Sequence, residues 1–440
     1  MTRGQRADEA RSGEPPSGPT WPRLQEPLSG QRLREVIATI SEVKRLRRRI
    51  LWSRRSIRER RDYITWYQFL GLPSSTWRFV SAPFRILAAV WRSGPTLRRT
   101  EGVPLPRQLA HVAWITLRWG LRPREYYLCG LYRPGGMRRA PLFITSRDHV
   151  EILLCLNSRS RPRLGKVEFW LRCREHGLPT IPILAECPAG APDPILYEPD
   201  SPEWEGDLIS KPSFGALGKE LRLWRREEDG GYRDGDTRVA SRTELLTWLM
   251  ARTDDDGTVV QPRRSNHPVL AEVSSGALCG IRIDTIREPR SKSIEVLFAM
   301  ARLPRTGAPA DNLGHGSIAA AVDLETGRLG LARSATPGGL GPKYDTHPEA
   351  GNRILGREVP YWREVLELVN RAHSVSPEAS LGWDVGVGES GPFLIETNRH
   401  WGCDLIHAVN DVPLGITSYP NHMLHYLKAE ALRRRMEQGR

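Results

Sequence analysis

Residues 382–400 read GWDVGVGESGPFLIETNRH, and this stretch decides the fold class. Two apolar runs flank a turn at Ser390–Gly391, which predicts a β-hairpin. Side chains two residues apart on a strand point to the same face, so Glu396 and Asn398 share a face. Pairing across the turn brings Asp384 beside them. Acidic residues at strand ends are also common on surfaces, but two carboxylates and an amide oxygen within apolar sequence favour a Mg²⁺ site.

The region before this hairpin has the pattern of an antiparallel sheet with helices. Residues 281–304 and 316–335 each contain two β-type runs around a polar or glycine-containing turn, so we expect two further hairpins. A helical period at 361–375 separates the second hairpin from the third. We therefore predict one α+β domain over residues 205–425.

Residues 123–204 alternate between short β-type runs and helical runs, which predicts an α/β lobe. The strands that we expect lie at 126–132, 140–146 and 178–187. The helices that we expect lie at 148–157 and 166–177.

The two ends of the chain differ from this central part. Residues 1–30 are rich in Pro, Gly, Ser and charge, and we expect a disordered tail. Residues 31–122 predict a basic helical region. Its first helix, at 31–62, has apolar residues at three- and four-residue steps and arginines on the opposite face. Residues 426–440 predict the end of a basic helix.

The basic excess limits the expected partners. The 440-residue chain has 65 Lys and Arg against 51 Asp and Glu, a net charge of +14. Such charge could bind phosphate, acidic polysaccharide or anionic lipid. The alternative is that the arginines simply form the solvated surface of a helix. No aromatic–basic stripe or nucleic-acid-binding motif is present, so we expect no nucleic-acid partner. The basic helix at 31–62 leaves peripheral contact with a membrane open.

The cysteines and the lengths of the apolar runs indicate the cellular compartment in which we expect the protein. None of the six cysteines forms a CxxC pair, and several lie in apolar sequence, so we expect buried free thiols. We find no signal-type segment and no apolar run of the ~18–20 residues that span a bilayer. We expect a cytoplasmic protein, with the inner membrane surface as an alternative. The oligomeric state cannot be predicted from these features.

A second group of residues indicates phosphate binding. A β-type run delivers Lys211 to a loop with Gly215 and Gly218, whose backbone N–H groups can close over phosphates. A plain turn is the alternative, because the loop is not a Walker A motif. An apolar strand ends at Gln261, where the backbone could contact adenine in a nucleotide site.

Two arginines stand inside β-type runs. Arg282 and Arg302 each need an acidic or phosphate partner if they are buried there. Each suits a γ-phosphate or an acyl-phosphate. Each equally suits a core carboxylate or an exposed position on the sheet.

Together and in this order, these motifs resemble the ATP-grasp superfamily. Within it the chain looks closest to the sugar-transfer-associated ATP-grasp group, related to glutathione synthetase-like carboxylate–amine ligases. The resemblance covers residues 123–420. It is carried by LGKVEFWLRCREHGLPTIP, the KP–glycine loop, VVQP followed by NHP, IRIDT, the DN…GS…VD stretch, HPEAGNRILGREVPYW and GWD…ETN. The loop reads GALGK, which is poorer in glycine than in many members.

The resemblance implies an ATP-grasp fold, in which two α/β lobes clasp ATP, here preceded by the basic helical region. It implies that Lys166 and Lys211 contact the phosphates of ATP. It also implies that Gln261 lies by the adenine hinge. Arg282 and Arg302 would meet the γ-phosphate or the acyl-phosphate.

The resemblance also implies a metal site and a substrate side. Asp384, Glu396 and Asn398 would hold Mg²⁺, with two ions expected. Asn312 and His315 fall where members of the superfamily place a loop on the substrate side.

The activity implied is ATP-dependent activation of a carboxylate as an acyl-phosphate, which an amine or another nucleophile then attacks. The substrate would be a small-molecule or glycan-precursor carboxylate, in polysaccharide or cell-surface glycan biosynthesis. Two alternatives remain at this point. One is a kinase acting on a sugar hydroxyl or a small molecule, and the other is a non-catalytic ATP-grasp protein.

Overall fold

The computed structural model describes residues 29–51, 74–156, 165–214, 221–305, 317–336 and 339–437. The predicted disordered tail, apart from its last two residues, lies outside these ranges, as does the second part of the helix expected at 31–62. Four predicted site residues also lie outside them: Gly215, Gly218, Asn312 and His315.

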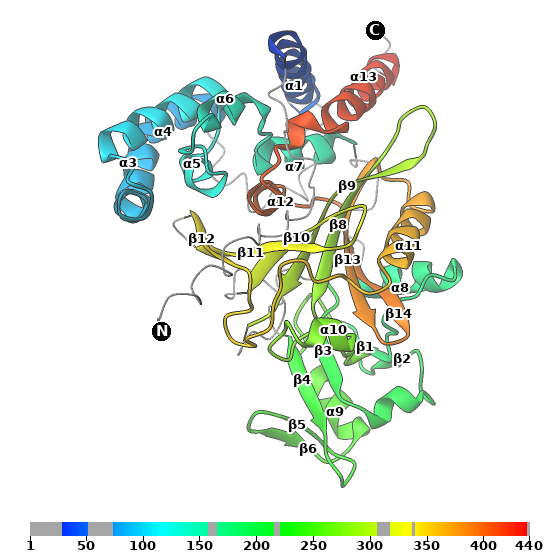
Figure 1. Ribbon diagram of the computed structural model, residues 1–440. Coiled ribbons are helices and arrows are strands. Elements are labelled where there is room, and N and C mark those ends of the chain that lie inside the picture. The colour runs from blue at the N-terminus through cyan, green and yellow to red at the C-terminus, as the bar shows by residue number, and fades with distance from the viewer. Residues whose placement is uncertain are drawn as a thin grey trace, which may run out of the picture.

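A first antiparallel sheet forms one lobe (Figure 1). Its strand order is β2-β1-β7-β3-β4-β5-β6. The strands are β1 (Ala185–Cys187), β2 (Ile195–Leu196), β3 (Leu208–Pro212), β4 (Arg222–Arg226), β5 (Tyr232–Asp234), β6 (Thr237–Val239) and β7 (Thr258–Pro262). Helix α9 (Arg242–Met250) begins at Ser241, whose hydroxyl accepts the backbone N–H of Glu244. Its Leu245 and Leu249 join Trp224 in the core of this lobe.

A second antiparallel sheet has the order β12-β11-β10-β9-β8-β13-β14. Its strands are β8 (Gly280–Arg287), β9 (Ile294–Leu303), β10 (Ile318–Val322), β11 (Leu329–Thr336), β12 (Gly339–Tyr344), β13 (Ser380–Gly388) and β14 (Gly391–Asn398). The three predicted hairpins are therefore confirmed, as β8–β9, β10–β11 and β13–β14. Gly391 ends the last turn with φ +118°, a conformation that favours glycine.

Both faces of the second sheet are covered, because its strands carry apolar side chains on both sides. One face packs on α11 (Trp362–Ser374), the helix predicted at 361–375. The other face packs on a layer of four helices. These helices are α1 (Gly30–Leu51), α7 (Ser146–Leu156), α12 (Asp404–Asn410) and α13 (Tyr419–Glu437). The single turn η4 (Leu414–Ile416) precedes α13.

A helical region lies beside this layer (Figure 1). It contains α3 (Ser74–Glu101), α4 (Leu105–Trp119), α5 (Pro123–Leu128) and α6 (Gly136–Arg139) around a core of their own. The strands expected at 126–132 and 140–146 are wrong, because these residues form α5 with its following turn and the short helix η1 (Ala140–Leu142). Pro123 starts α5, and Glu125 caps it by accepting the backbone N–H of Arg122.

The two lobes are joined along the edge strand β14. Helix α8 (Lys166–Glu175) is followed by residues that pair with this strand, since the backbone N–H of Leu394 donates to Pro179 at 2.8 Å. The chain leaving β7 bonds to the same hairpin, where the N–H of His267 donates to Val387 at 2.7 Å. Two short helices complete the description, η2 (Pro202–Glu205) and α10 (Pro268–Ala271). No helix within the described ranges is long and apolar enough to cross a membrane.

Candidate active site

The structure brings together the three oxygen-bearing side chains of the last hairpin. Asp384 on β13 lies directly opposite Glu396 on β14, and Gly382 lies opposite Asn398. A bulge makes Ile395 the extra residue of β14. The Asn398 amide donates to Asp384 Oδ2 at 3.3 Å and to Glu396 Oε1 at 3.2 Å. Two strands thus hold two carboxylates and an amide in one cluster.

Two arginines on neighbouring strands converge on Asp384. Arg282 lies opposite Asp384 on β8, and its Nε and Nη2 donate to the two carboxylate oxygens at 2.6 and 2.9 Å. Arg302 on β9 places Nη2 2.6 Å from Oδ1. Burial by itself would raise the pKa of Asp384, which is 2% exposed, but the two guanidinium groups outweigh burial and lower it. Both arginines therefore meet a carboxylate, one of the partners that the sequence left open.

Glu396 behaves in the opposite way. Burial, followed by the charge of Asp384 and a hydrogen bond with it, raises the pKa of Glu396, while Lys211 and Lys166 oppose this shift. The two carboxylates therefore differ in character, and Glu396 holds its proton more strongly. A cation bound between them would favour the charged form of Glu396.

The two lysines come from the other lobe. Lys211 lies near the end of β3, and Lys166 is the first residue of α8, where its Nζ donates to the carbonyl of Pro212 at 2.8 Å. Burial and the charge of Lys166 lower the pKa of Lys211 to about 8, against the influence of Glu396. Burial also lowers the pKa of Lys166, which interacts with the same Glu396. Both lysines thus approach the acidic cluster across the junction of the lobes.

Gln261 has a different environment from these charged groups. It lies in β7 opposite Ile209, and its side-chain amide donates to the carbonyl of Ile181 at 3.1 Å. The side chain is buried and holds the end of β7 to the segment after α8. Contact with adenine would therefore come from the backbone around Gln261, and this role stays a prediction.

Asp284 is a residue of the cluster that the sequence motifs did not predict. It lies two residues after Arg282 on β8 and shares its face, and it is fully buried. Within the described part of the chain, neither of its carboxylate oxygens has a hydrogen-bond partner. Burial and the charge of Asp384 raise the pKa of Asp284 to about 8, although Arg282 and Arg302 oppose the shift. The spacing of Arg282 and Asp284 in IRIDT was the signal that could have revealed it.

The cluster fits a phosphate-bound Mg²⁺. Within the described residues, no three His, Cys, Asp or Glu side chains gather as a ready metal site. Asp384 and Glu396 lie opposite each other, and the Asn398 NH2 group donates to both carboxylates. With the amide turned so that its oxygen faces the cation, these three side chains would give the small oxygen set that Mg²⁺ accepts when phosphates supply further ligands. The surrounding Lys166, Lys211, Arg282 and Arg302 add four positive charges, so the site as a whole suits a polyphosphate.

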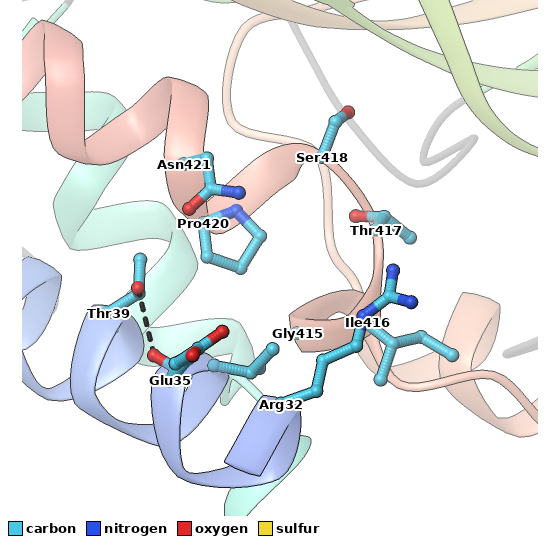
Figure 2. Close-up of a pocket in the computed structure, with 10 residues that line it drawn as sticks. Arg32, Glu35, Thr39, Gly415, Ile416, Thr417, Ser418, Pro420 and Asn421 are labelled. Atoms are coloured by element: carbon cyan, nitrogen blue, oxygen red, sulfur yellow. Dashed lines mark hydrogen bonds between the residues drawn. The ribbon is translucent and has the colours of Figure 1, made fainter. Parts of the chain in front are cut away.

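Two cavities lie apart from these residues. One, of about 460 Å³, lies between α1 and the η4–α13 segment and is lined by residues including Arg32, Glu35 and Asn421 (Figure 2). The other, of about 300 Å³, lies between α1 and the end of α4. Neither cavity is lined by a residue of the cluster, so the candidate site is defined by its side chains.

Comparison with known families identifies the central part of the chain. A model described as sugar-transfer associated ATP-grasp matches residues 197–416, half of the chain. This protein belongs to the sugar-transfer-associated ATP-grasp family. The match includes Lys211, Gln261 and all of the arginine and acidic cluster, but it excludes Lys166. The assignment of Lys166 to the site of this ATP-grasp protein therefore depends on the sequence resemblance and on its interaction with Glu396 in the structure.

Solved structures resemble the ATP-grasp protein weakly. An ATP-grasp ligase PsnB, in complex with a phosphomimetic variant of its minimal precursor, Mg and ADP, is 14% identical, with a TM-score of 0.32 over 61% of this chain and 59% of that one. D-alanine–D-alanine ligase from Bacillus anthracis with ATP is 14% identical, with a TM-score of 0.32 over 62% and 68%. N5-carboxyaminoimidazole synthetase from Staphylococcus aureus with ADP is 10% identical, with a TM-score of 0.34 over 64% and 58%. No curated protein matches the chain.

Proposed function

We propose that this ATP-grasp protein is a Mg-ATP-dependent ligase. It activates a carboxylate as an acyl-phosphate, and an amine or another nucleophile then displaces phosphate. The observation that carries the proposal is the electrostatic interaction of Lys166 and Lys211, from one lobe, with Glu396 of the other lobe, which lies opposite Asp384. Cations on one wall and paired carboxylates on the other suit a Mg-bound triphosphate between them.

The side chains divide into two roles. Lys166 and Lys211 hold phosphate oxygens from the first lobe, while Asp384, Glu396 and Asn398 hold Mg²⁺. When bound, Mg²⁺ neutralises phosphate charge and orients the transferred group. We infer that two ions would be held here, with Asp384, Glu396 and Asn398 as the protein ligands.

The arginines stabilise charge on the transferred group. Arg282 and Arg302 lie next to the carboxylate pair and are nearly enclosed, with their side chains 13% and 15% exposed. A guanidinium in such surroundings interacts strongly with the oxygens of a phosphoryl or acyl-phosphate group. Both now bond to Asp384, so a cation on Asp384 would free their N–H groups for substrate.

The substrate class is part of the proposal. The description of the family refers to sugar transfer. We infer a small-molecule or glycan-precursor carboxylate as the substrate, in polysaccharide or cell-surface glycan biosynthesis. The use of ATP and six buried free thiols support action in the cytoplasm.

The test is a trapping assay on the full chain with ATP, Mg²⁺ and a panel of sugar acids and amino acids. Hydroxylamine converts an acyl-phosphate to a stable hydroxamate, and the ligase reaction releases ADP and inorganic phosphate. Oxygen-18 in the substrate carboxylate should appear in the released phosphate. Glu396→Gln should abolish both signals, and Glu378→Gln, a buried acid outside the cluster, should keep them.

The same assay separates the alternatives. A phosphorylated acceptor without inorganic phosphate would identify a kinase. Failure of the wild-type protein to bind Mg-ATP would exclude both the ligase and the kinase activity and would indicate a non-catalytic protein.

A further inference from the structure

Helix α3 carries two apolar stripes, and within the part of the chain that the structure describes only one of them has a partner. Ile86 and Val90 are buried in the core of the helical region. Phe84 and Trp91 lie on another side of the helix, seven residues apart, and are 75% and 84% exposed. Leu87 lies between them on the same side and is also exposed. A large aromatic stripe in water is unusual for a helix whose first stripe already forms a core.

Helix α4 repeats this arrangement beside α3. Val112 and Ile115 are fully buried, while Trp114 and Leu117 are each 56% exposed. The two helices pack on each other and lie at the outer edge of the molecule, beyond α5 and α6 (Figure 1). We call Phe84, Leu87, Trp91, Trp114 and Leu117 together the α3–α4 surface.

Arginines border these stripes. On α3, Arg85, Arg92 and Arg99 recur every seven residues, which aligns them along one edge of the exposed stripe. On α4, Arg107 and Arg118 flank Trp114. Glu101 is the single acidic residue of the two helices. Among the residues that the structure describes, none of these five arginines forms an ion pair with a carboxylate, so the border keeps its positive charge.

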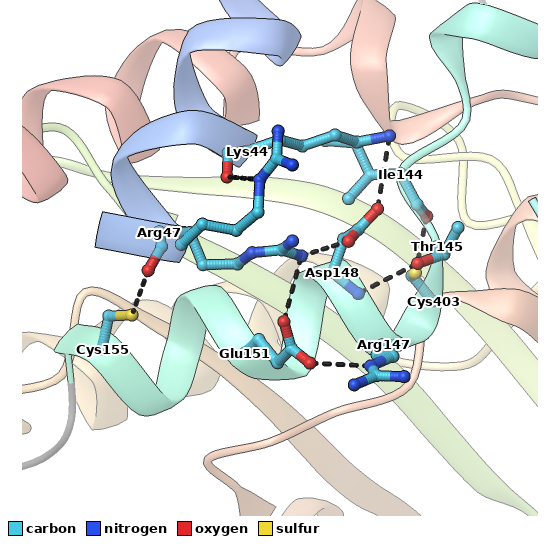
Figure 3. Close-up of polar contacts among 10 residues, drawn as sticks. Lys44, Arg47, Ile144, Thr145, Arg147, Asp148, Glu151, Cys155 and Cys403 are labelled. Carbon is cyan, nitrogen blue, oxygen red and sulfur yellow. Dashed lines mark hydrogen bonds and ion pairs between the residues drawn. The ribbon is translucent and has the colours of Figure 1, made fainter. Parts of the chain in front are cut away.

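Helix α1 is arranged differently, although it is as basic. Its Ile40 and Val43 are buried against α7 and α13. Lys44 lies 3.3 Å from Asp148, and Arg47 pairs with Asp148 and, at 3.3 Å, with Glu151 (Figure 3). The apolar face of α1 and part of its charge are therefore used inside the protein.

The cavity between α1 and α4 extends the positive border of the α3–α4 surface. Arg118, at the end of α4, lines this cavity of about 300 Å³ together with Lys44, Arg47 and Arg48. Among the described residues that line it, Asp148 is the single carboxylate. Lys44 and Arg47 are paired with Asp148 there, so an anionic head group would meet Arg48 and Arg118 at the edge of the exposed stripes.

We propose that the α3–α4 surface docks this protein on an anionic lipid bilayer. Phe84, Trp91 and Trp114 lie at the boundary of head groups and acyl chains, and the bordering arginines bind lipid phosphates. The positive charge of the border favours an anionic bilayer over a second copy of the chain, because dimerisation would bring two rows of arginines against each other. The proposal does not depend on the catalytic function.

The test uses full-length protein and sedimentation with phosphatidylcholine vesicles, with and without phosphatidylglycerol. We expect binding to the anionic vesicles alone. Phe84→Ser combined with Trp91→Ser should weaken binding about tenfold or more. Arg92→Glu combined with Arg99→Glu should also weaken it, with the larger effect at low salt. These side chains are exposed, so each variant should keep the wild-type melting temperature.

A matched control lies on α13. Leu432→Ser combined with Met436→Ser removes two apolar side chains that are 60% and 72% exposed. Their neighbours Arg433 and Arg434 are paired with Glu430 and Glu437, so this variant should leave binding unchanged. Since all six cysteines are buried, an environment-sensitive dye can be placed on Trp91→Cys or on Leu432→Cys. Its emission should shift to the blue with anionic vesicles at position 91 and not at 432.

Three outcomes would overturn the proposal. The first is wild-type protein that ignores anionic vesicles. The second is unchanged binding by the Phe84/Trp91 variant, which would assign any attraction to charge elsewhere. The third is a dye at position 91 that is already shielded without vesicles, either in a dimer or by another part of the chain.

Discussion

Replacing Asp384 by Asn removes the negative charge on which Arg282 and Arg302 converge. The three side chains are 3%, 13% and 15% exposed, so the pairing is largely shielded from water. Breaking a buried ion pair typically lowers the free energy of unfolding by about 3–5 kcal/mol. The Asn oxygen still accepts one hydrogen bond, so we expect about 3 kcal/mol. For a unit the size of the family match, residues 197–416, a loss of about 3 kcal/mol corresponds to a fall in melting temperature of roughly 6–12 °C.

The response to ligands makes this prediction specific to the proposed site. Mg-ATP at a hundredfold excess over Kd should stabilise the wild-type protein by about 2.7 kcal/mol. Asp384→Asn should lose the part of this increment that depends on Mg²⁺. It should keep or increase the response to ATP with a chelator, because Arg282 and Arg302 no longer have Asp384 as a counterion.

Glu378 provides the control. It is 3% exposed, lies just before β13, and pairs with Arg399 at 2.6 Å, so Glu378→Gln also breaks a buried ion pair. We expect a similar loss of stability with an unchanged Mg²⁺ response. The reasoning is refuted if Asp384→Asn melts within about 1 °C of the wild type, or if its response to Mg-ATP equals that of Glu378→Gln.

Three further predictions concern single side chains around the cluster. Lys211→Met should weaken ATP binding about tenfold or more. In calorimetry, ATP binding to the wild type should weaken as the pH rises through about 8, where Lys211 loses its proton. The variant should lack this pH dependence. The pKa of Asp284 is raised in the folded state, so the wild type should lose stability as the pH rises. The loss should begin at about pH 4, where the carboxyl of the unfolded chain ionises, and end at about pH 8, where the carboxyl of the folded protein ionises. Asp284→Asn should melt at a higher temperature than the wild type at pH 8, with little difference at pH 4. Gly382→Ala would place a Cβ 2.8 Å from Cβ of Trp401 and 2.9 Å from Asp284 Oδ1. This crowding should lower the free energy of unfolding by about 1–3 kcal/mol in denaturant titrations. Gly402→Ala, which would place its Cβ in open space, should not lower it.

Local pattern was sufficient for the three hairpins of the second sheet. Its hairpins depend on turns of a few residues and on alternating side chains, so the pairing of Asp384 with Glu396 followed from the turn at Ser390–Gly391. Local pattern failed at 126–132, where adjacent apolar residues resemble a strand. Pro123 and the Glu125 cap start a helix there, and a neighbouring helical core buries Tyr126 and Tyr127.

The sequence by itself determined the α+β class, the three hairpins and the charged residue types of the candidate site, because strand period and turn chemistry act over a few residues. The tertiary structure alone decided which charges meet. Arg282 and Arg302 took a carboxylate rather than solvent, and Lys166 reached the cluster from another lobe. Asp284 was left buried without a hydrogen bond to any described residue. Such pairings depend on strand order and on desolvation, which arise only when segments far apart in the chain pack together.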